Sequence, residues 1–159
     1  AAIIGLAKAM EIANNQRELD IKHDQELVQE LKSLISNKIP RIGFTGPKNL
    51  NQRIPGMLSM IIEGIEGEAI LLGLDMQGIC ASSGSACSTG SIEPSHVLTA
   101  IGIPNDLARG SLRLSFGREN TKNDVEYISK VLPDIISNLR ELSSQKNISK
   151  KTQSEWLEN

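Results

Sequence analysis

The chain has 159 residues, 39% hydrophobic but only 3% aromatic, which suffices for one domain with an aliphatic core. Its formal net charge of −2 gives no reason to expect nucleic acid or an anionic membrane as a partner. No apolar run approaches the roughly 20 residues that cross a bilayer, and no secretory leader pattern opens the chain, so we expect a soluble, cytoplasmic protein without a membrane partner.

The first 37 residues predict one long helix (1–37), because apolar residues recur at roughly helical spacing on both sides of a polar stretch, and Pro40 prevents its continuation. Short strands are expected at 41–45 and 57–62, followed by a helix at 67–76. The next expected elements are a brief strand at 79–81, a helix at 94–101 and a strand at 111–116.

Thr121–Asp124 resembles a capping box and opens a last helix, which Pro133 is expected to kink. The polar residues 143–159 are expected to form a tail. The order of elements predicts a small mixed sheet packed with helices, an α/β (α+β) domain.

The two cysteines predict neither a disulfide framework nor a metal centre, since no Cys-x-x-Cys pair or His at ligand spacing accompanies them. Cys80 lies in an apolar stretch and is expected to be a small buried hydrophobe. We expect His23 to be solvated, and neither His23 nor His96 belongs to a recognisable acid–base set.

Residues 82–91 contain only Ser, Gly, Ala, Thr and one cysteine, Cys87. Small residues let a loop move at little steric cost, and a thiolate is a strong nucleophile. A mobile thiol of this kind suits group transfer. The composition alone leaves a surface loop with an incidental cysteine equally open.

Arg113 alternates with apolar residues in the strand expected at 111–116. The apolar set then faces the core, and Arg113 points to the opposite face, where a guanidinium clamps a carboxylate well. A solvated or structurally paired arginine is the open alternative.

The segment 82–88, Ser-Ser-Gly-Ser-Ala-Cys-Ser, resembles the active-site loop of NifS/IscS-like cysteine desulfurases, in its long-loop version. The segments 93–98 (Glu-Pro-Ser-His-Val-Leu) and 111–118 (Ser-Leu-Arg-Leu-Ser-Phe-Gly-Arg) are similar to that family in order and spacing, and 53–55 and 66–68 fit its upstream pattern. The resemblance extends to about residue 142.

The resemblance implies a C-terminal small domain (1–142) of a fold-type I transferase that depends on pyridoxal phosphate. It implies that Cys87 takes sulfur from L-cysteine, leaving L-alanine, and passes the persulfide to acceptor proteins such as an iron–sulfur scaffold. Arg113 matches the position that holds the substrate carboxylate. The intact protein is expected to be a homodimer.

The chain departs from the family's pattern at Gly56-Met57, where Asn-rich positions are usual. No lysine here stands in the family's Schiff-base context, so we expect the large cofactor-binding domain to lie outside this chain, and the chain alone to be inactive and free of cofactor. A selenocysteine lyase-like enzyme and a non-catalytic interaction domain are the alternatives that the sequence leaves open.

Overall fold

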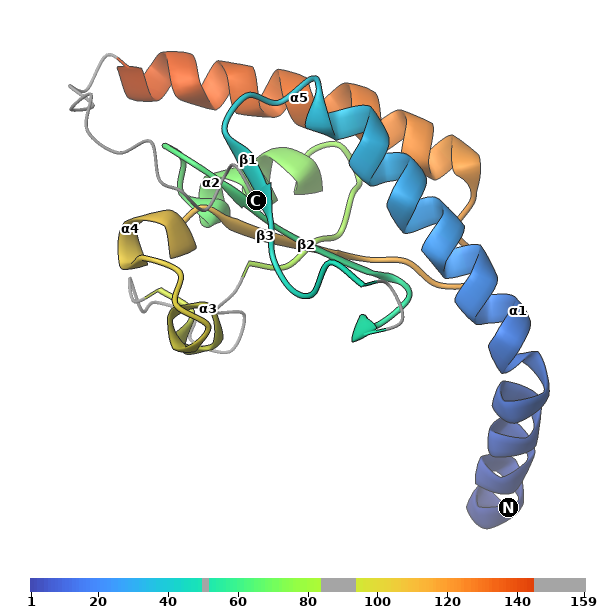
Figure 1. Ribbon diagram of the computed structural model, residues 1–159. Coiled ribbons are helices and arrows are strands. Elements are labelled where there is room, and N and C mark those ends of the chain that lie inside the picture. Colours follow the sequence, from blue (N-terminus) through green and yellow to red (C-terminus); the bar gives the residue numbers. More distant parts are fainter. Residues whose placement is uncertain (50–51, 84–93, 145–159) are drawn as a thin grey trace.

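A small sheet lies between two long helices on one face and two short ones on the other (Figure 1). The computed structural model describes residues 1–49, 52–83 and 94–144. The elements are α1 (Ala2–Ser36), β1 (Ile42–Phe44), β2 (Met57–Ile62), α2 (Gly67–Asp75), α3 (His96–Ala100), α4 (Asn105–Ala108), β3 (Ser111–Ser115) and α5 (Lys122–Ser144). None of the helices among these residues is long and apolar enough to cross a membrane.

The three strands run in the order β1-β2-β3, and both pairs are antiparallel. In the register, Phe44 faces Met60 and Ser59 faces Arg113. The α/β class with a small sheet packed by helices is confirmed. The sequence predicted a mixed sheet, whereas the described strands pair only in the antiparallel sense.

The main core lies between one face of the sheet and the helices α1, α2 and α5. Along β2 and β3 every second side chain points into this core, and each of these side chains is apolar. Its largest fully buried members are Leu27, Leu31, Ile35, Ile39, Leu58, Met60, Ile62, Ile70, Leu74, Leu112, Leu132 and Ile136.

A second, smaller cluster lies on the opposite face of the sheet, under α3 and α4. It consists of Ile61, Leu98, Ile103, Leu107 and Ala108. This cluster covers one end of that face only, because Arg113 and Ser115 of the neighbouring strand remain exposed. The uncovered end is where the candidate site lies.

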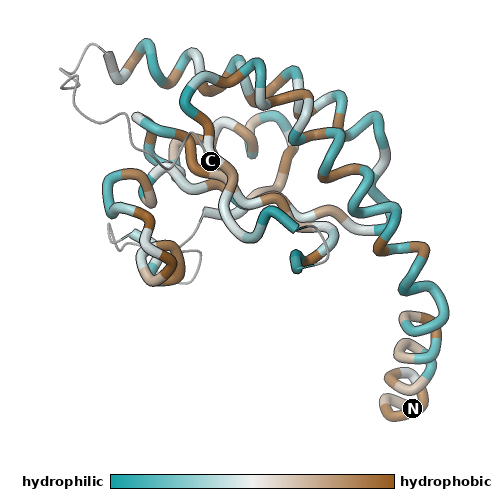
Figure 2. Tube along the Cα trace, in the orientation of Figure 1, coloured by the Kyte–Doolittle hydropathy of each residue, from teal (hydrophilic) through white to brown (hydrophobic). Residues whose placement is uncertain are grey.

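Helix α1 is packed along only half of its length. Its buried residues, Leu27, Val28, Leu31 and Ile35, all belong to its C-terminal half. The N-terminal turns project away from the sheet (Figure 1), and hydrophobic positions continue along them (Figure 2). Apolar side chains exposed there are Ile3, Ile4, Leu6, Met10, Ile12 and Leu19.

Helix α5 begins with the predicted cap, since the Asp124 carboxylate accepts a hydrogen bond from the Thr121 N–H at 2.8 Å. The helix contains Pro133 and continues to Ser144, two positions into the expected tail.

The strand predicted at 79–81 is wrong, because only Ser82 makes a bridge. Helix α4 was not predicted, since four residues are too short for a periodic signal.

A close backbone approach at Gly110 connects β2 to the start of β3. The Gly110 C=O accepts the Ile62 N–H at 2.8 Å. A Cβ atom at Gly110 would lie 2.1 Å from the carbonyl oxygen of Ile62, which is a severe overlap with backbone. Only glycine fits this contact without moving the strand.

We therefore predict that Gly110→Ala lowers the free energy of unfolding by about 1–3 kcal/mol, as overpacking does elsewhere. The matched control is Gly5→Ala in α1, where a Cβ would meet nothing within 4 Å. This control should leave stability unchanged or slightly raised. Equal losses in chemical denaturation of the two variants would contradict the assignment.

Candidate functional site

Arg113 lies in the middle of β3, between the buried Leu112 and Leu114. Because those neighbours point into the main core, the Arg113 side chain extends from the opposite, exposed face, as the alternation predicted. Within residues 1–49, 52–83 and 94–144, its guanidinium makes no hydrogen bond or ion pair. The structural pairing that the sequence left open is therefore not seen in this part of the chain.

Ser82 pairs with Arg113 on the side of β3 away from β2. The Arg113 N–H donates to the Ser82 C=O at 2.7 Å, and the Ser82 N–H donates to the Arg113 C=O at 3.0 Å. These two backbone hydrogen bonds extend the sheet by one residue. They fix Ser82, the first residue of the small-residue segment, beside Arg113.

The Arg113 side chain lines a groove of about 530 Å³ between α1, the chain before β2 and the end of β3. The lining residues are Ala13, Arg17, Asp20, Ile21, Asp24, Ile54, Pro55, Gly56, Met57, Arg113, Ser115 and Phe116. Asp20 is held by Arg118 at 2.8 Å, so this carboxylate already has a partner and ties α1 to the end of β3.

Asp24 contributes a second carboxylate to the groove. Its Oδ1 atom is buried without a hydrogen-bond partner among the described residues. Burial raises the pKa of Asp24, the His23 neighbour opposes that shift, and Asp20 adds to it. The groove thus combines a guanidinium with a carboxylate that is poorly stabilised in its charged form.

Gly56 explains the departure from the family's pattern. Its C=O accepts the Phe116 N–H at 2.7 Å, and a Cβ here would lie 2.5 Å from the Phe116 carbonyl oxygen and 3.0 Å from Asp24 Oδ2. The loop before β2 therefore lies too close to β3 and α1 for any side chain at this position.

Two expectations about single residues need correction. Cys80 is exposed, not buried, because Ile79 and Ala81 pack against the main core and the intervening side chain points the other way. His23 is half-buried and not solvated, with Nε2 2.9 Å from the Asn120 carbonyl oxygen. Cys87, the expected nucleophile, lies outside the described residues.

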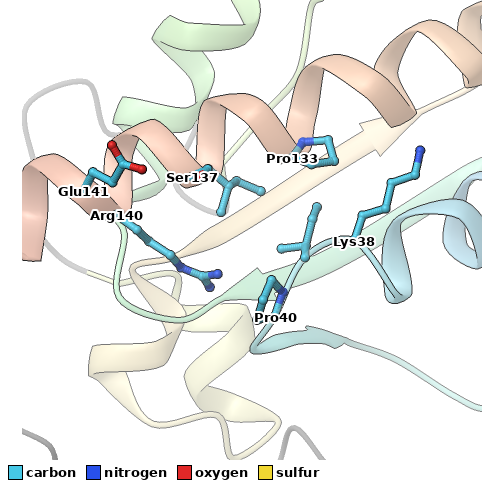
Figure 3. Close-up of a pocket in the computed structure, with 8 residues that line it drawn as sticks. Lys38, Pro40, Pro133, Ser137, Arg140 and Glu141 are labelled. Atoms are coloured by element: carbon cyan, nitrogen blue, oxygen red, sulfur yellow. The ribbon is translucent and has the colours of Figure 1, made fainter.

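A second hollow, of about 480 Å³, separates α5 from the turn between α1 and β1 (Figure 3). Arg140 reaches from α5 toward the strands, and Glu141 points elsewhere (Figure 3). The Arg140 guanidinium donates to the Glu63 C=O at 3.1 Å, while burial, reinforced by Arg41, lowers its pKa. Arg140 thus connects α5 to the end of β2, a structural role.

The groove around Arg113 does not by itself suit pyridoxal phosphate. The described residues that line it include no lysine to form a Schiff base and no histidine to stack on a ring. Among the described residues, no three His, Cys, Asp or Glu side chains gather as a metal site requires. What this part of the chain offers is a groove lined by the Arg113 guanidinium, which makes no hydrogen bond or ion pair with the described residues.

Comparison with known proteins identifies the family. The model for class-V aminotransferases matches residues 1–128. The chain belongs to the class-V aminotransferase family.

Within this class-V family, the chain is similar to cysteine desulfurases. It is 45% identical over 143 residues to the cysteine desulfurase IscS of Clostridium botulinum (strain Hall), covering 90% of this chain and 36% of that protein. It is 43% identical over 145 residues to the cysteine desulfurase of Nostoc sp. (strain PCC 7120), covering 91% of this chain and 36% of that protein. The chain thus spans little more than a third of these relatives.

A solved structure titled NifS-like protein superimposes with a TM-score of 0.72 at 31% identity, covering 86% of this chain and 33% of that chain. This similarity confirms the expected fold type, because both the sequence and the arrangement of elements match over most of the chain.

Asp24 generates a prediction about pH. Because its folded pKa lies above the unfolded value, the folded state holds more protons, and the free energy of unfolding falls as pH rises through that window. Asp24→Asn removes this dependence. The stability of the variant relative to the parent should therefore increase as pH rises from about 4 to 7.

The measurement is chemical denaturation at several pH values, with Asp134→Asn, an exposed carboxylate on α5, as control. A stability difference for Asp24→Asn that stays constant with pH, as for the control, would contradict the prediction.

Proposed function

We propose that this chain is the substrate-binding and sulfur-accepting part of a cysteine desulfurase. Sulfur from L-cysteine passes to Cys87, and Arg113 holds the substrate carboxylate. The chain's similarity to cysteine desulfurases supports the reaction class, and the Ser82–Arg113 pairing supports the assignment of residues.

The pairing carries the argument because it joins the two sequence features that the reaction needs. Cys87 is five residues beyond Ser82, so covalent geometry keeps its Cα within about 18 Å of a residue hydrogen-bonded to Arg113. A thiol on so short a tether has a high effective concentration around a substrate that Arg113 binds.

Arg113 suits the carboxylate of an amino acid. Its planar guanidinium presents two parallel N–H donors, and the described residues leave these donors unused. Asp24 lies in the same groove and repels anions. A zwitterionic amino acid therefore binds with its carboxylate toward Arg113 and away from Asp24.

In the proposed reaction the Cys87 thiolate attacks the sulfur of L-cysteine, and a sulfur–sulfur bond forms. The carbon–sulfur bond of the substrate breaks, and its carbon takes up a proton to become the methyl group of L-alanine. Cys87 is left as a persulfide. Pyridoxal phosphate, when bound, supplies the electron sink that such chemistry needs.

We further propose that the cofactor's main ligands lie outside this chain, since the described residues that line the Arg113 groove include no lysine or histidine to hold it. Release of sulfur to an acceptor protein, for iron–sulfur clusters or thiolation, and dimerisation of the intact protein belong to the same proposal. The chain's coverage of its relatives, little more than a third, fits a part of a larger enzyme.

Cys87→Ala in the full-length protein should abolish release of sulfide from L-cysteine in the presence of a reductant, because the accepting sulfur is gone. Cofactor absorbance should be unchanged. The matched control is Cys80→Ala, which removes the other, exposed thiol and should keep normal activity. Sulfide release that survives in Cys87→Ala would exclude Cys87 from the reaction.

Arg113→Lys should raise the KM for L-cysteine about 10- to 100-fold, since a lysine cannot make the two parallel bonds of a guanidinium. The control is Arg109→Lys, whose guanidinium lies 3.9 Å from the exposed Glu66 and outside the groove. Steady-state kinetics of both full-length variants provide the measurement. Equal KM values for the two variants would argue against a substrate contact at Arg113.

A further inference from the structure

The free edge of β1 presents unused backbone groups. β1 is the outer strand of the described sheet and pairs only with β2. The Thr45 N–H donates to the Ser59 C=O at 3.0 Å, which sets the alternation of the antiparallel ladder. The N–H and C=O groups of Ile42 and Phe44 therefore point away from β2, toward the open side.

A hollow of about 700 Å³ follows this edge, and its two sides differ. The C-terminal half of α1 provides one side, with the polar residues Lys32 and Ser36. The other, apolar side is formed by Ile61, Ile103 and Leu107 of the small cluster and by the neighbouring Ile101. Ile101 remains 52% exposed, so this side has apolar surface available for contact.

The charged side chains in the lining are all cationic, namely Lys32, Lys48 and Arg53. Lys32 Nζ lies 4.9 Å from the centre of the Phe44 ring, directly over β1. Arg53 donates to the Gly46 C=O at 3.3 Å, which places its charge just past the end of the strand. None of the described residues in the lining is Asp or Glu, so the hollow favours an anionic occupant.

We propose that this edge is a docking site for an extended peptide of a partner protein in which apolar and acidic residues alternate. Such a peptide would add a strand antiparallel or parallel to β1 and bond to Ile42 and Phe44. Successive side chains of a strand point to opposite faces, so the acidic ones meet Lys32 and the apolar ones meet Ile101.

The alternation of the peptide follows from the contrast between the two sides of the hollow. A uniformly acidic peptide leaves the apolar side uncovered, and a uniformly apolar one leaves Lys32 without a counter-charge. Sheet edges are commonly protected by shortness and by lysines; β1 has only three residues, and Lys32 of α1 lies over its Phe44 ring. The shortness of the edge and the nearby lysine limit pairing with arbitrary strands, whereas the lysine attracts an acidic partner.

The edge is separate from the proposed sulfur-transfer site, because β1 and β3 lie on opposite sides of β2. Docking here leaves Arg113 accessible. The inference does not depend on the reaction proposed above, and its test needs no turnover.

The test uses the full-length protein and a fluorescein-labelled heptapeptide, Glu-Val-Glu-Val-Glu-Val-Glu, followed by fluorescence anisotropy. We expect saturable binding that weakens as salt is added. Two further peptides serve as controls: one with every Glu replaced by Lys, and one with alternate backbone nitrogens methylated to block strand pairing. Neither should bind.

Two variants test the two sides of the hollow. Lys32→Glu and Ile101→Asp should each weaken binding by at least about tenfold. Their controls, Lys22→Glu on the same helix and Val97→Asp on α3, change exposed residues outside the hollow and should bind normally. All four positions are exposed, so circular dichroism should show folded proteins.

Equal binding of the Lys-containing or methylated peptide, or unchanged affinity in both Lys32→Glu and Ile101→Asp, would overturn the proposal. Absence of binding to the full-length protein would also overturn it. If binding appears only after residues 145–159 are removed, the chain's own end competes for the edge, and a partner protein is excluded as the natural occupant.

Discussion

Strand β3 holds the molecule together because it is hydrogen-bonded along both edges. One edge pairs with β2 through five residue pairs, and the other exchanges two backbone bonds with Ser82. Its Leu112 and Leu114 side chains belong to the main core, and its exposed Arg113 lines the groove. The same five residues therefore contribute to the core, to the candidate site and to the fixed origin of the cysteine-bearing segment.

The position of Arg113 is restricted by its surroundings. Arg113 is positioned by a strand whose neighbours are buried, so its Cα can move little without disturbing the core. The segment that begins at Ser82 consists of small residues and carries the thiol. The proposed reaction would use Arg113 as a fixed binding group and Cys87 as a tethered nucleophile, so that sulfur is collected in one place and released in another.

The sequence predicted those features that depend on local periodicity. The alternation around Arg113 placed its side chain on the correct face, and the Thr121–Asp124 pattern located the start of α5. The sequence did not predict contacts between segments that are distant along the chain. The pairing of Ser82 with Arg113 and the buried carboxylate of Asp24 both depend on how α1, β2 and β3 meet, which no local pattern encodes. The exposure of Cys80 was missed because composition suggested burial, whereas alternation with Ile79 decides it.

The exposed thiol of Cys80 affects how this protein can be probed. Reagents that alkylate or label cysteines will react with an accessible side chain, whether or not it takes part in the reaction. One equivalent of label on the chain is therefore no measure of modification at Cys87. Peptide mapping, or a background in which Cys80 is replaced by serine, is required before any labelling stoichiometry or mass shift is assigned to persulfide chemistry.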